Sequence, residues 1–173
     1  IRPTVIAMNA EGNRYRGFLY AGLMIGDDGV ARVIEYNCRF GDPETQPILM
    51  RLESDLVDLC LAACQGELET RTTSWDKRAS VGVVLAARGY PGEYAKGDLI
   101  ENIPLDSENG KVFHAGTRTD ADGNIRSAGG RVLCAVGLGK DVREAQHRAY
   151  GLVEKISWDS AIYRTDIGFK AFK

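Results

Sequence analysis

Hydrophobic and polar positions alternate through the first quarter of the chain in the manner of a β-hairpin. Two segments rich in β-branched and aromatic residues, 17–25 and 30–38, are separated by the sequence Gly-Asp-Asp-Gly at 26–29. Residues of this kind favour strands, and a short connection of glycine and aspartate favours a tight turn. The sequence therefore predicts a strand over 17–25 that returns through the turn into a second strand over 30–38.

Apolar residues at helical spacing predict short helices on either side of this hairpin. Pro3 suits the first turn of one helix, and Gly12 can end it. After the hairpin, residues 45–52 predict a second helix that carries Pro47 in its first turn. The first part of the chain is therefore expected to combine helices with a hairpin.

A third helix is predicted to begin after Ser54, which can cap it, and to end at Gly66. Its apolar residues recur at i, i+3, i+4 and i+7, and we expect this face to join the core: Leu56, Leu59, Cys60 and Ala63. Cys60 and Cys64 lie one helical turn apart and could chelate a metal. We expect both instead to be small buried hydrophobic residues, because free cysteine is usually buried.

The second half of the chain is predominantly strand. Residues 67–78 are polar and rich in threonine, and we place a domain boundary there, which divides the chain into 1–70 and 71–173. Beyond this boundary the pattern predicts a turn at 120–124 and four strands, which cover 81–87, 98–103, 111–117 and 131–138.

One main helix follows these strands. Asp141 can cap its start, and Glu144, three residues later, completes a capping box. Its apolar residues form one inward stripe: Val142, Ala145, Ala149, Leu152 and Val153. The predicted elements together define an α+β fold whose second domain is small and β-rich.

The composition is that of an ordinary globular chain. Of the 173 residues 44% are hydrophobic, and the net charge is −2 with the two signs interspersed. A nucleic-acid-binding domain would show a basic patch or stripe, so we expect no nucleic-acid partner. No apolar run approaches the roughly 18 residues of a membrane span, and the start carries no signal peptide. We therefore expect a cytoplasmic chain without a membrane partner, with its four cysteines reduced.

The candidate chemistry gathers at the end of the second predicted strand. Because side chains alternate between the two faces of a strand, Glu35, Asn37 and Arg39 are expected to share one face. A carboxylate and an amide oxygen two residues apart suit Mg²⁺ or Mn²⁺, which leave coordination positions for phosphate oxygens. Arg39 can bind phosphate or carboxylate through two parallel hydrogen bonds. The alternative is a charged strand end whose side chains are merely solvated.

Two further carboxylates follow on a turn. Pro43 fixes its own φ and biases Asp42 towards an extended conformation, so the strand is expected to end here. Glu44 comes directly after this proline. Three carboxylates, an amide and a guanidinium thus lie within ten residues, which favours a binding site over a plain solvated surface.

At these residues the chain resembles a known family. The pattern Glu35-x-Asn37-x-Arg39 is similar to the metal-and-phosphate strand of ATP-grasp ligases. The segment 39–44 (Arg-Phe-Gly-Asp-Pro-Glu) resembles the signature of the glycinamide ribonucleotide synthetase family. Four later segments resemble the carboxy-terminal domain of that family: 89–92 (Gly-Tyr-Pro-Gly), 112–117 (Val-Phe-His-Ala-Gly-Thr), 129–132 (Gly-Gly-Arg-Val) and 166–168 (Asp-Ile-Gly).

The resemblance implies a fold for each part of the chain. Residues 1–70 would be the carboxy-terminal part of an ATP-grasp domain, and residues 71–173 a barrel-sandwich-like domain that packs beside the active site. Members of the family are more than twice as long, so a chain that begins at Ile1 is expected to be a carboxy-terminal fragment. The adenine pocket would lie in the missing amino-terminal half of the enzyme, so the fragment is expected to be inactive alone.

The resemblance also implies an activity. Members ligate glycine to phosphoribosylamine at the expense of ATP, through a glycyl phosphate, in de novo purine biosynthesis. Glu35 and Asn37 would hold Mg²⁺ or Mn²⁺, and Arg39 would stabilise the transferring phosphoryl group. Asp42 or Glu44 would receive the ammonium of glycine or orient the attacking amine. The neighbouring strand over 17–25 contains no acidic residue, so only two metal ligands are identified.

Two alternatives belong to other classes. One is a different ATP-grasp carboxylate–amine ligase, and the other is a non-catalytic β-rich interaction or carrier module. A carrier would place a modifiable lysine at a hairpin tip, and the tip at 121–124 has none.

We expect His114 to be a hydrogen-bonded structural residue rather than a base, and the segment 89–92 to be a plain loop.

Overall fold

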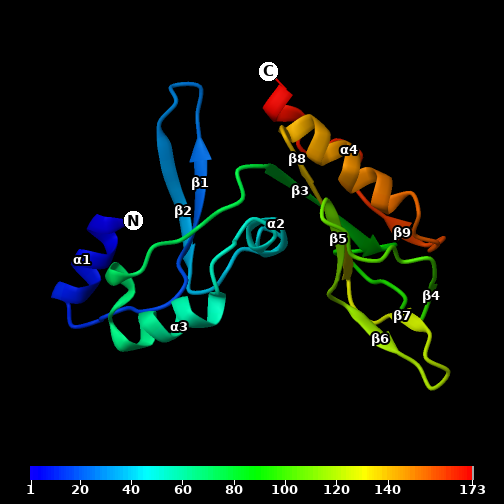
Figure 1. Ribbon diagram of the computed structural model, residues 1–173, viewed down its shortest axis with the longest axis horizontal. Coiled ribbons are helices and arrows are strands. Elements are labelled where there is room, and N and C mark those ends of the chain that lie inside the picture. The colour runs from blue at the N-terminus through cyan, green and yellow to red at the C-terminus, as the bar shows by residue number, and fades with distance from the viewer. Residues whose placement is uncertain (173) are drawn as a thin grey trace. The chain divides into compact units, whose positions relative to one another are not determined.

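The chain divides into two compact units, which are described one at a time (Figure 1). The computed structural model describes residues 1–172, so the last residue of the predicted second domain, Lys173, lies outside the described residues. The first unit contains residues 1–42 and 52–75, and the second contains 43–51 and the chain from Asp76 onward. The fold is mixed helix and sheet, as the sequence predicted.

The first unit is built on the predicted hairpin. Strands β1 (Tyr20–Ile25) and β2 (Ala31–Asn37) pair antiparallel, and the N–H of Gly29 donates to the carbonyl of Gly26 at 3.0 Å to close the turn. Each strand is shorter than its predicted range. A bulge between Gly22 and Leu23 shifts the register within the ladder, which bends the hairpin locally.

Two helices and a short 3-10 turn complete this unit: α1 (Arg2–Ala10), α3 (Leu56–Gln65) and η1 (Leu68–Thr70). The predicted cap of α3 is wrong by one residue. Asp55 caps the helix, because its carboxylate accepts the N–H groups of Val57 and Asp58 at 2.7 and 3.1 Å. Ser54 instead accepts the N–H of Ser74. The helix ends at Gly66 in the left-handed conformation, as predicted.

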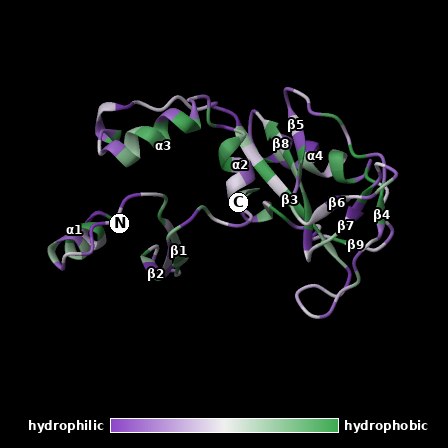
Figure 2. Cartoon of the chain, turned by 90° about the horizontal axis from the view of Figure 1, so that it is seen from below, coloured by the Kyte–Doolittle hydropathy of each residue, from purple (hydrophilic) through white to green (hydrophobic). Residues whose placement is uncertain are grey.

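The prediction that Cys60 and Cys64 are buried is wrong. Cys60 is half-buried and Cys64 is exposed, although most of α3 is hydrophobic in composition (Figure 2). Ala62 is the single buried residue of this helix, and Leu61 is 56% exposed. The reason is that the described residues of this unit cover α3 on one side only, so hydrophobic residues on its other side remain in solvent.

The second unit contains a four-stranded antiparallel sheet in the order β5-β8-β3-β9. Its strands are β3 (Ala79–Ala87), β5 (Gly110–His114), β8 (Arg131–Gly139) and β9 (Ala161–Ile162). Helix α4 (Val142–Val153) packs on one face of β8 and β3 (Figure 1). Alternate residues of β3 meet α4 in the core, namely Val81, Val83 and Leu85. The short helix α2 (Thr45–Leu49) contacts β3 through Gly82, which lies on the other face.

A second, three-stranded sheet has the order β4-β7-β6. Its strands are β4 (Leu99–Ile100), β6 (Thr117–Thr119) and β7 (Ile125–Ser127). The last described element is the 3-10 turn η2 (Phe169–Phe172). The strand predicted over 111–117 is therefore split between two sheets. The chain turns at Gly116, whose N–H donates to the Arg131 carbonyl at 3.0 Å and whose backbone abuts Gly129.

Helix α4 begins as the sequence predicted. The Asp141 carboxylate accepts the Glu144 N–H at 2.8 Å. The Glu144 carboxylate accepts the N–H of Lys140, one residue before the cap residue whose N–H a capping box usually uses. It also accepts a hydrogen bond from the Arg148 guanidinium. Its stripe faces the sheet, with Ala145, Ala149 and Val153 buried. Among residues 1–172 no helix is both long enough and apolar enough to cross a membrane.

Two glycines of β8 allow α4 to approach the sheet closely. A Cβ atom added at Gly137 would lie 2.5 Å from the backbone nitrogen of Ala149, and one at Gly139 would lie 2.8 Å from the backbone of Glu144. Real Cβ atoms do not come this near to backbone atoms, so any side chain here would push the helix off the strand.

We therefore predict that Gly137→Ala destabilises the chain by about 1–3 kcal/mol through overpacking. Gly151→Ala is the matched control. It lies on α4 with nothing within 4 Å of the added Cβ, and it should be neutral or stabilising by up to about 1 kcal/mol because alanine favours helix. Urea denaturation of both variants measures the difference. Equal stability of the two variants would contradict the close approach of α4 to β8.

The turn at 120–124 is held by the carboxylate of Asp120. It accepts hydrogen bonds from Arg126 Nε at 2.6 Å and from the N–H groups of Asn124 and Asp122 at 2.9 and 3.0 Å. The Arg126 guanidinium and the backbone donors lower the pKa of Asp120 from 3.8 to about 2. The ionised carboxylate therefore links both strands of the β6-β7 hairpin.

This shift predicts a pH-dependent contribution to stability. Because the folded pKa of Asp120 lies below the unfolded value, its stabilisation is complete above about pH 4 and is lost as the pH falls through about 2. Asp120→Asn should lower the melting temperature at pH 7 and flatten its decline between pH 4 and 2. Asp122→Asn, in the same turn, should follow the unsubstituted chain. Parallel curves for the unsubstituted chain and Asp120→Asn would rule out this contribution.

Candidate functional site

The predicted metal pair lies together on β2. Glu35 and Asn37 are two residues apart on this strand, so their side chains share a face. The amide Nδ2 of Asn37 donates a hydrogen bond to Glu35 Oε1 at 2.9 Å. Opposite Glu35 on β1 stands Gly22, where an added Cβ would come within 3.1 Å of the Glu35 side chain. The absence of a side chain at Gly22 leaves room for Glu35.

The remaining oxygens of this pair suit a hard divalent cation. With the amide nitrogen of Asn37 turned to Glu35 Oε1, the Asn37 Oδ1 and Glu35 Oε2 atoms stay available as ligands. Residues 1–172 contain no group of three or more His, Cys, Asp or Glu side chains that could hold a metal. Two oxygen ligands fit Mg²⁺, which usually keeps several waters and binds substrate phosphates as well as one or two protein groups.

Arg39 lies beyond the strand. Because β2 ends at Asn37, the alternation that predicted a shared face does not extend to Arg39. Its Nη1 atom donates to the carbonyl of Phe40 at 2.8 Å, and the side chain is exposed. The Phe40 ring stacks on Phe18 with 3.9 Å between centroids, and the chain bends between the strand and this contact.

The two carboxylates of the turn fall in different units. Asp42 is exposed and ends the first segment of the first unit. Glu44 is half-buried and stands directly before α2 in the second unit, where its side chain does not cap the helix. Each unit therefore carries one of the two residues predicted to bind substrate, and their roles stay predictions.

Sequence reasoning did not single out Gln46. Its Oε1 atom is buried and has no hydrogen-bond partner within residues 1–172. A buried amide oxygen without a donor is destabilising, so such an atom marks a position where a donor from a ligand would be favourable. The feature of the sequence that could have drawn attention to Gln46 is its position two residues after Glu44, at the end of the charged segment.

Two glycine-containing segments that lie far apart in the sequence, 89–92 and 129–132, are in contact in the second unit. The Tyr90 ring packs on the backbone of Gly130, where an added Cβ would lie 2.7 Å from the ring atom Cε2 and still nearer to Cδ2. The Arg131 guanidinium lies 5.7 Å from the centroid of that ring. Elsewhere in this unit, His114 is exposed and its Nδ1 atom lies 3.1 Å from Thr117 Oγ1. The structural role of His114 stays a prediction.

Comparison with known proteins places these features in a class. Residues 1–45, which include the hairpin and the Glu35–Asn37 pair, match the family model described as phosphoribosylglycinamide synthetase, ATP-grasp (A) domain. The first unit thus carries part of an ATP-grasp domain. Residues 80–170, more than half of the chain, match the phosphoribosylglycinamide synthetase C domain. The chain belongs to the phosphoribosylglycinamide synthetase family, as the resemblance of its segments predicted.

Curated relatives agree with this assignment. The chain is 60% identical to a phosphoribosylamine–glycine ligase of Salmonella typhimurium over 174 aligned residues, which cover 100% of this chain and 41% of that protein. It is 62% identical to the ligase of the same name from Vibrio parahaemolyticus, over 99% of this chain and 40% of that protein. The chain therefore spans about two fifths of the length of these relatives.

Solved structures share the fold. A phosphoribosylamine–glycine ligase from Thermotoga maritima superposes with a TM-score of 0.79 at 40% identity, covering 93% of this chain and 39% of that one. The biotin carboxylase domain of a 2-oxoglutarate carboxylase from Hydrogenobacter thermophilus gives a TM-score of 0.66 over 98% of this chain and 40% of that one. That likeness, at 16% identity, shows the fold alone.

Proposed function

We propose that the chain is the carboxy-terminal part of a phosphoribosylamine–glycine ligase. The complete enzyme would join glycine to phosphoribosylamine and release glycinamide ribonucleotide, ADP and phosphate, in de novo purine biosynthesis. The observation that carries the proposal is the Glu35–Asn37 pair on one face of β2, within the segment that matches the ATP-grasp domain. The names of the 60% and 62% identical relatives support the choice of substrates.

The first step would make glycyl phosphate. An oxygen of the glycine carboxylate forms a bond to the γ-phosphorus of ATP, while the bond from that phosphorus to the bridging oxygen breaks and ADP leaves. Both reactants are anions, so their repulsion must be neutralised for the atoms to meet. Glu35 and Asn37 would hold Mg²⁺ or Mn²⁺ through their available oxygens. When bound, that ion neutralises charge on the phosphate oxygens.

The second step would form the amide. The amine of phosphoribosylamine attacks the acyl carbon of glycyl phosphate, and phosphate leaves. Arg39 would stabilise the charge on the phosphoryl group in both steps, since the hydrogen bond to Phe40 occupies only one of its five N–H donors. Asp42 or Glu44 would receive the ammonium of glycine or orient the attacking amine.

The proposal also concerns the partners of this chain. ATP, glycine and phosphoribosylamine would be bound together with an amino-terminal half of the same enzyme, which would supply the adenine pocket. Residues 1–173 alone would then be inactive as a ligase. A cytoplasmic location and the use of Mg²⁺ or Mn²⁺ as the metal stay predictions.

The metal pair is tested in the full-length ligase that contains this chain. Glu35→Gln and Asn37→Ala should each raise the Mg²⁺ concentration needed for half-maximal ADP formation, by about 10–100-fold, the scale seen when metal ligands lose their positioning. Excess Mg²⁺ should restore part of the turnover of Asn37→Ala, because one oxygen ligand remains.

Asp27→Asn is the matched control, because Asp27 is an exposed acidic residue in the turn of the same hairpin. It should keep the Mg²⁺ dependence of the unsubstituted enzyme. Unchanged Mg²⁺ dependence in both Glu35→Gln and Asn37→Ala would show that the pair does not bind the metal.

Arg39 is tested by two substitutions in the same enzyme. Arg39→Ala removes a preorganised donor and should lower turnover by roughly 10²–10³, or about 3–4 kcal/mol. Arg39→Lys keeps a cation but loses the planar arrangement of donors, so its turnover should be intermediate. The loss should appear in turnover more than in ATP affinity, since the charge develops in the transition state.

A purely structural Arg39 would behave differently. Both substitutions would then lower the melting temperature and leave turnover of the folded enzyme nearly intact. Melting temperature and single-turnover ADP formation, measured on the same preparations, separate the two roles. Full ADP formation by folded Arg39→Ala would remove Arg39 from the chemistry.

A further inference from the structure

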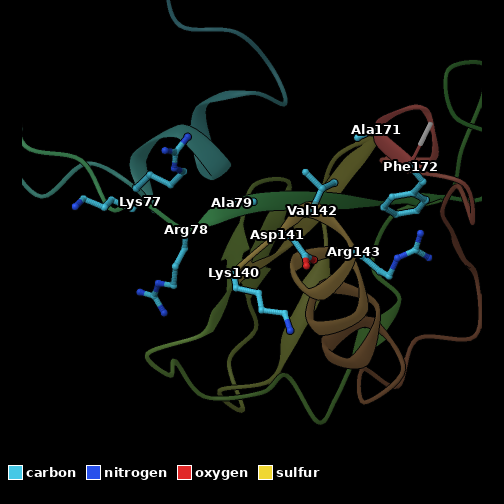
Figure 3. A pocket seen from close by; sticks show the side chains of 10 residues that line it. Lys77, Arg78, Ala79, Lys140, Asp141, Val142, Arg143, Ala171 and Phe172 are labelled. Atoms are coloured by element: carbon cyan, nitrogen blue, oxygen red, sulfur yellow. The ribbon is translucent and has the colours of Figure 1, made fainter.

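A basic pocket lies in the second unit, where β3 and α4 begin (Figure 3). Its volume is about 560 Å³, and its lining combines five cationic side chains, one carboxylate and a small apolar wall: Arg51, Lys77, Arg78, Ala79, Lys140, Asp141, Val142, Arg143, Ala171 and Phe172. The strand register brings these residues together, because Ala79 at the start of β3 pairs with Gly139 at the end of β8. The residues before Ala79 and after Gly139 therefore meet at one edge of the sheet.

The charge of the pocket contrasts with that of the chain, whose net charge is −2. The single carboxylate in the lining, Asp141, is already engaged, since it accepts the Glu144 N–H at the start of α4. Cations gathered around one cavity repel one another, and the repulsion is stronger where water is partly excluded. An anion in the cavity would relieve it.

One of the five cations is committed to the fold. Arg78 forms an ion pair with Asp76 at 2.5 Å and donates to Asn109 Oδ1 at 3.0 Å, and the guanidinium lowers the pKa of Asp76. Arg51 donates from Nε and Nη2 to the carbonyl of Asp76 at 3.1 and 3.0 Å, and its charge also helps to lower the pKa of the Asp76 carboxylate, so Arg51 is engaged in the fold as well.

The other three are available to a ligand. Within residues 1–172, Lys77, Lys140 and Arg143 form no ion pair. The Arg143 guanidinium lies 4.4 Å from the centroid of the Phe172 ring, a contact that holds the cation in place without neutralising it. In Figure 3 Arg143 extends beside Phe172 and Lys140 extends from the start of α4, whereas Lys77 points away from them. Lys140 and Arg143 flank Asp141 at the start of α4, so these two cations are chosen for substitution.

We propose that this pocket binds a small phosphate-bearing anion. Its volume is that of a small-molecule site, about 300–1,000 Å³, and its cations line one cavity rather than a stripe along the surface. Lysine and arginine are the side chains that bind phosphate through charge-assisted hydrogen bonds. The pocket lies wholly within the second unit, so the inference does not rest on the Glu35–Asn37 pair or on the proposed ligase activity.

Calorimetric titration of the chain tests the proposal, with inorganic phosphate, pyrophosphate and ADP as probes at low salt in the presence of EDTA. The double variant Lys140→Gln/Arg143→Gln should bind pyrophosphate at least tenfold more weakly than the unsubstituted chain. The control Arg118→Gln/Lys155→Gln removes the same charge from two exposed positions outside the pocket and should bind normally. Similar affinity for pyrophosphate and ADP would assign recognition to the phosphates, and tighter ADP binding would add a contact to the nucleoside.

No binding of any probe, or equal weakening in both double variants, would overturn the proposal. Amide resonances of the unsubstituted chain provide a readout that does not depend on how the variants fold. On addition of pyrophosphate, shifts should gather at residues 77–79 and 140–143. Shifts confined to residues 1–42, or spread evenly over exposed lysines and arginines, would also overturn it.

Discussion

The second unit depends on the contact between the backbone of α4 and the glycines of β8. With no side chain at Gly137 and Gly139, the helix rests directly on the strand, and its buried alanines lie flush against the sheet. Close packing of this kind fixes the position of α4 relative to β8, because neither element can move without opening a void. The start of α4 is thereby held beside the start of β3, where Lys140 and Arg143 border the basic pocket.

The first unit is organised by a different interaction. Ala62 is the one hydrophobic residue of this unit that is buried, and the hairpin exposes several large side chains, among them Met24 at 59% and Ile34 at 64%. The antiparallel ladder, rather than a packed core, therefore holds Glu35 and Asn37 in place. Strand alternation sets their shared face, and the Asn37–Glu35 hydrogen bond orients the amide so that both residues keep an oxygen available.

Local signals in the sequence predicted most of the elements. The alternation over 17–38, the capping residues around Asp141 and the apolar stripe of α4 each depend on neighbours within a few positions, and the structure confirms them. The predictions were wrong where contacts between residues far apart in the chain determine burial or the extent of a strand. Cys64 is of a residue type that is usually buried, but it is exposed. The segment 111–117 is divided between two sheets because Gly116 contacts Arg131 and Gly129.

By itself, then, the sequence determined the local elements, the Glu35–Asn37 pair and the family, because these depend on periodicity and on short motifs. Tertiary structure alone decided that Arg39 lies beyond the end of β2 and that Gln46 Oε1 is buried without a partner within residues 1–172. It also decided that cations from three separate segments line one pocket. The physical reason is that burial and charge density sum contributions from residues far apart in the chain, which no local pattern records.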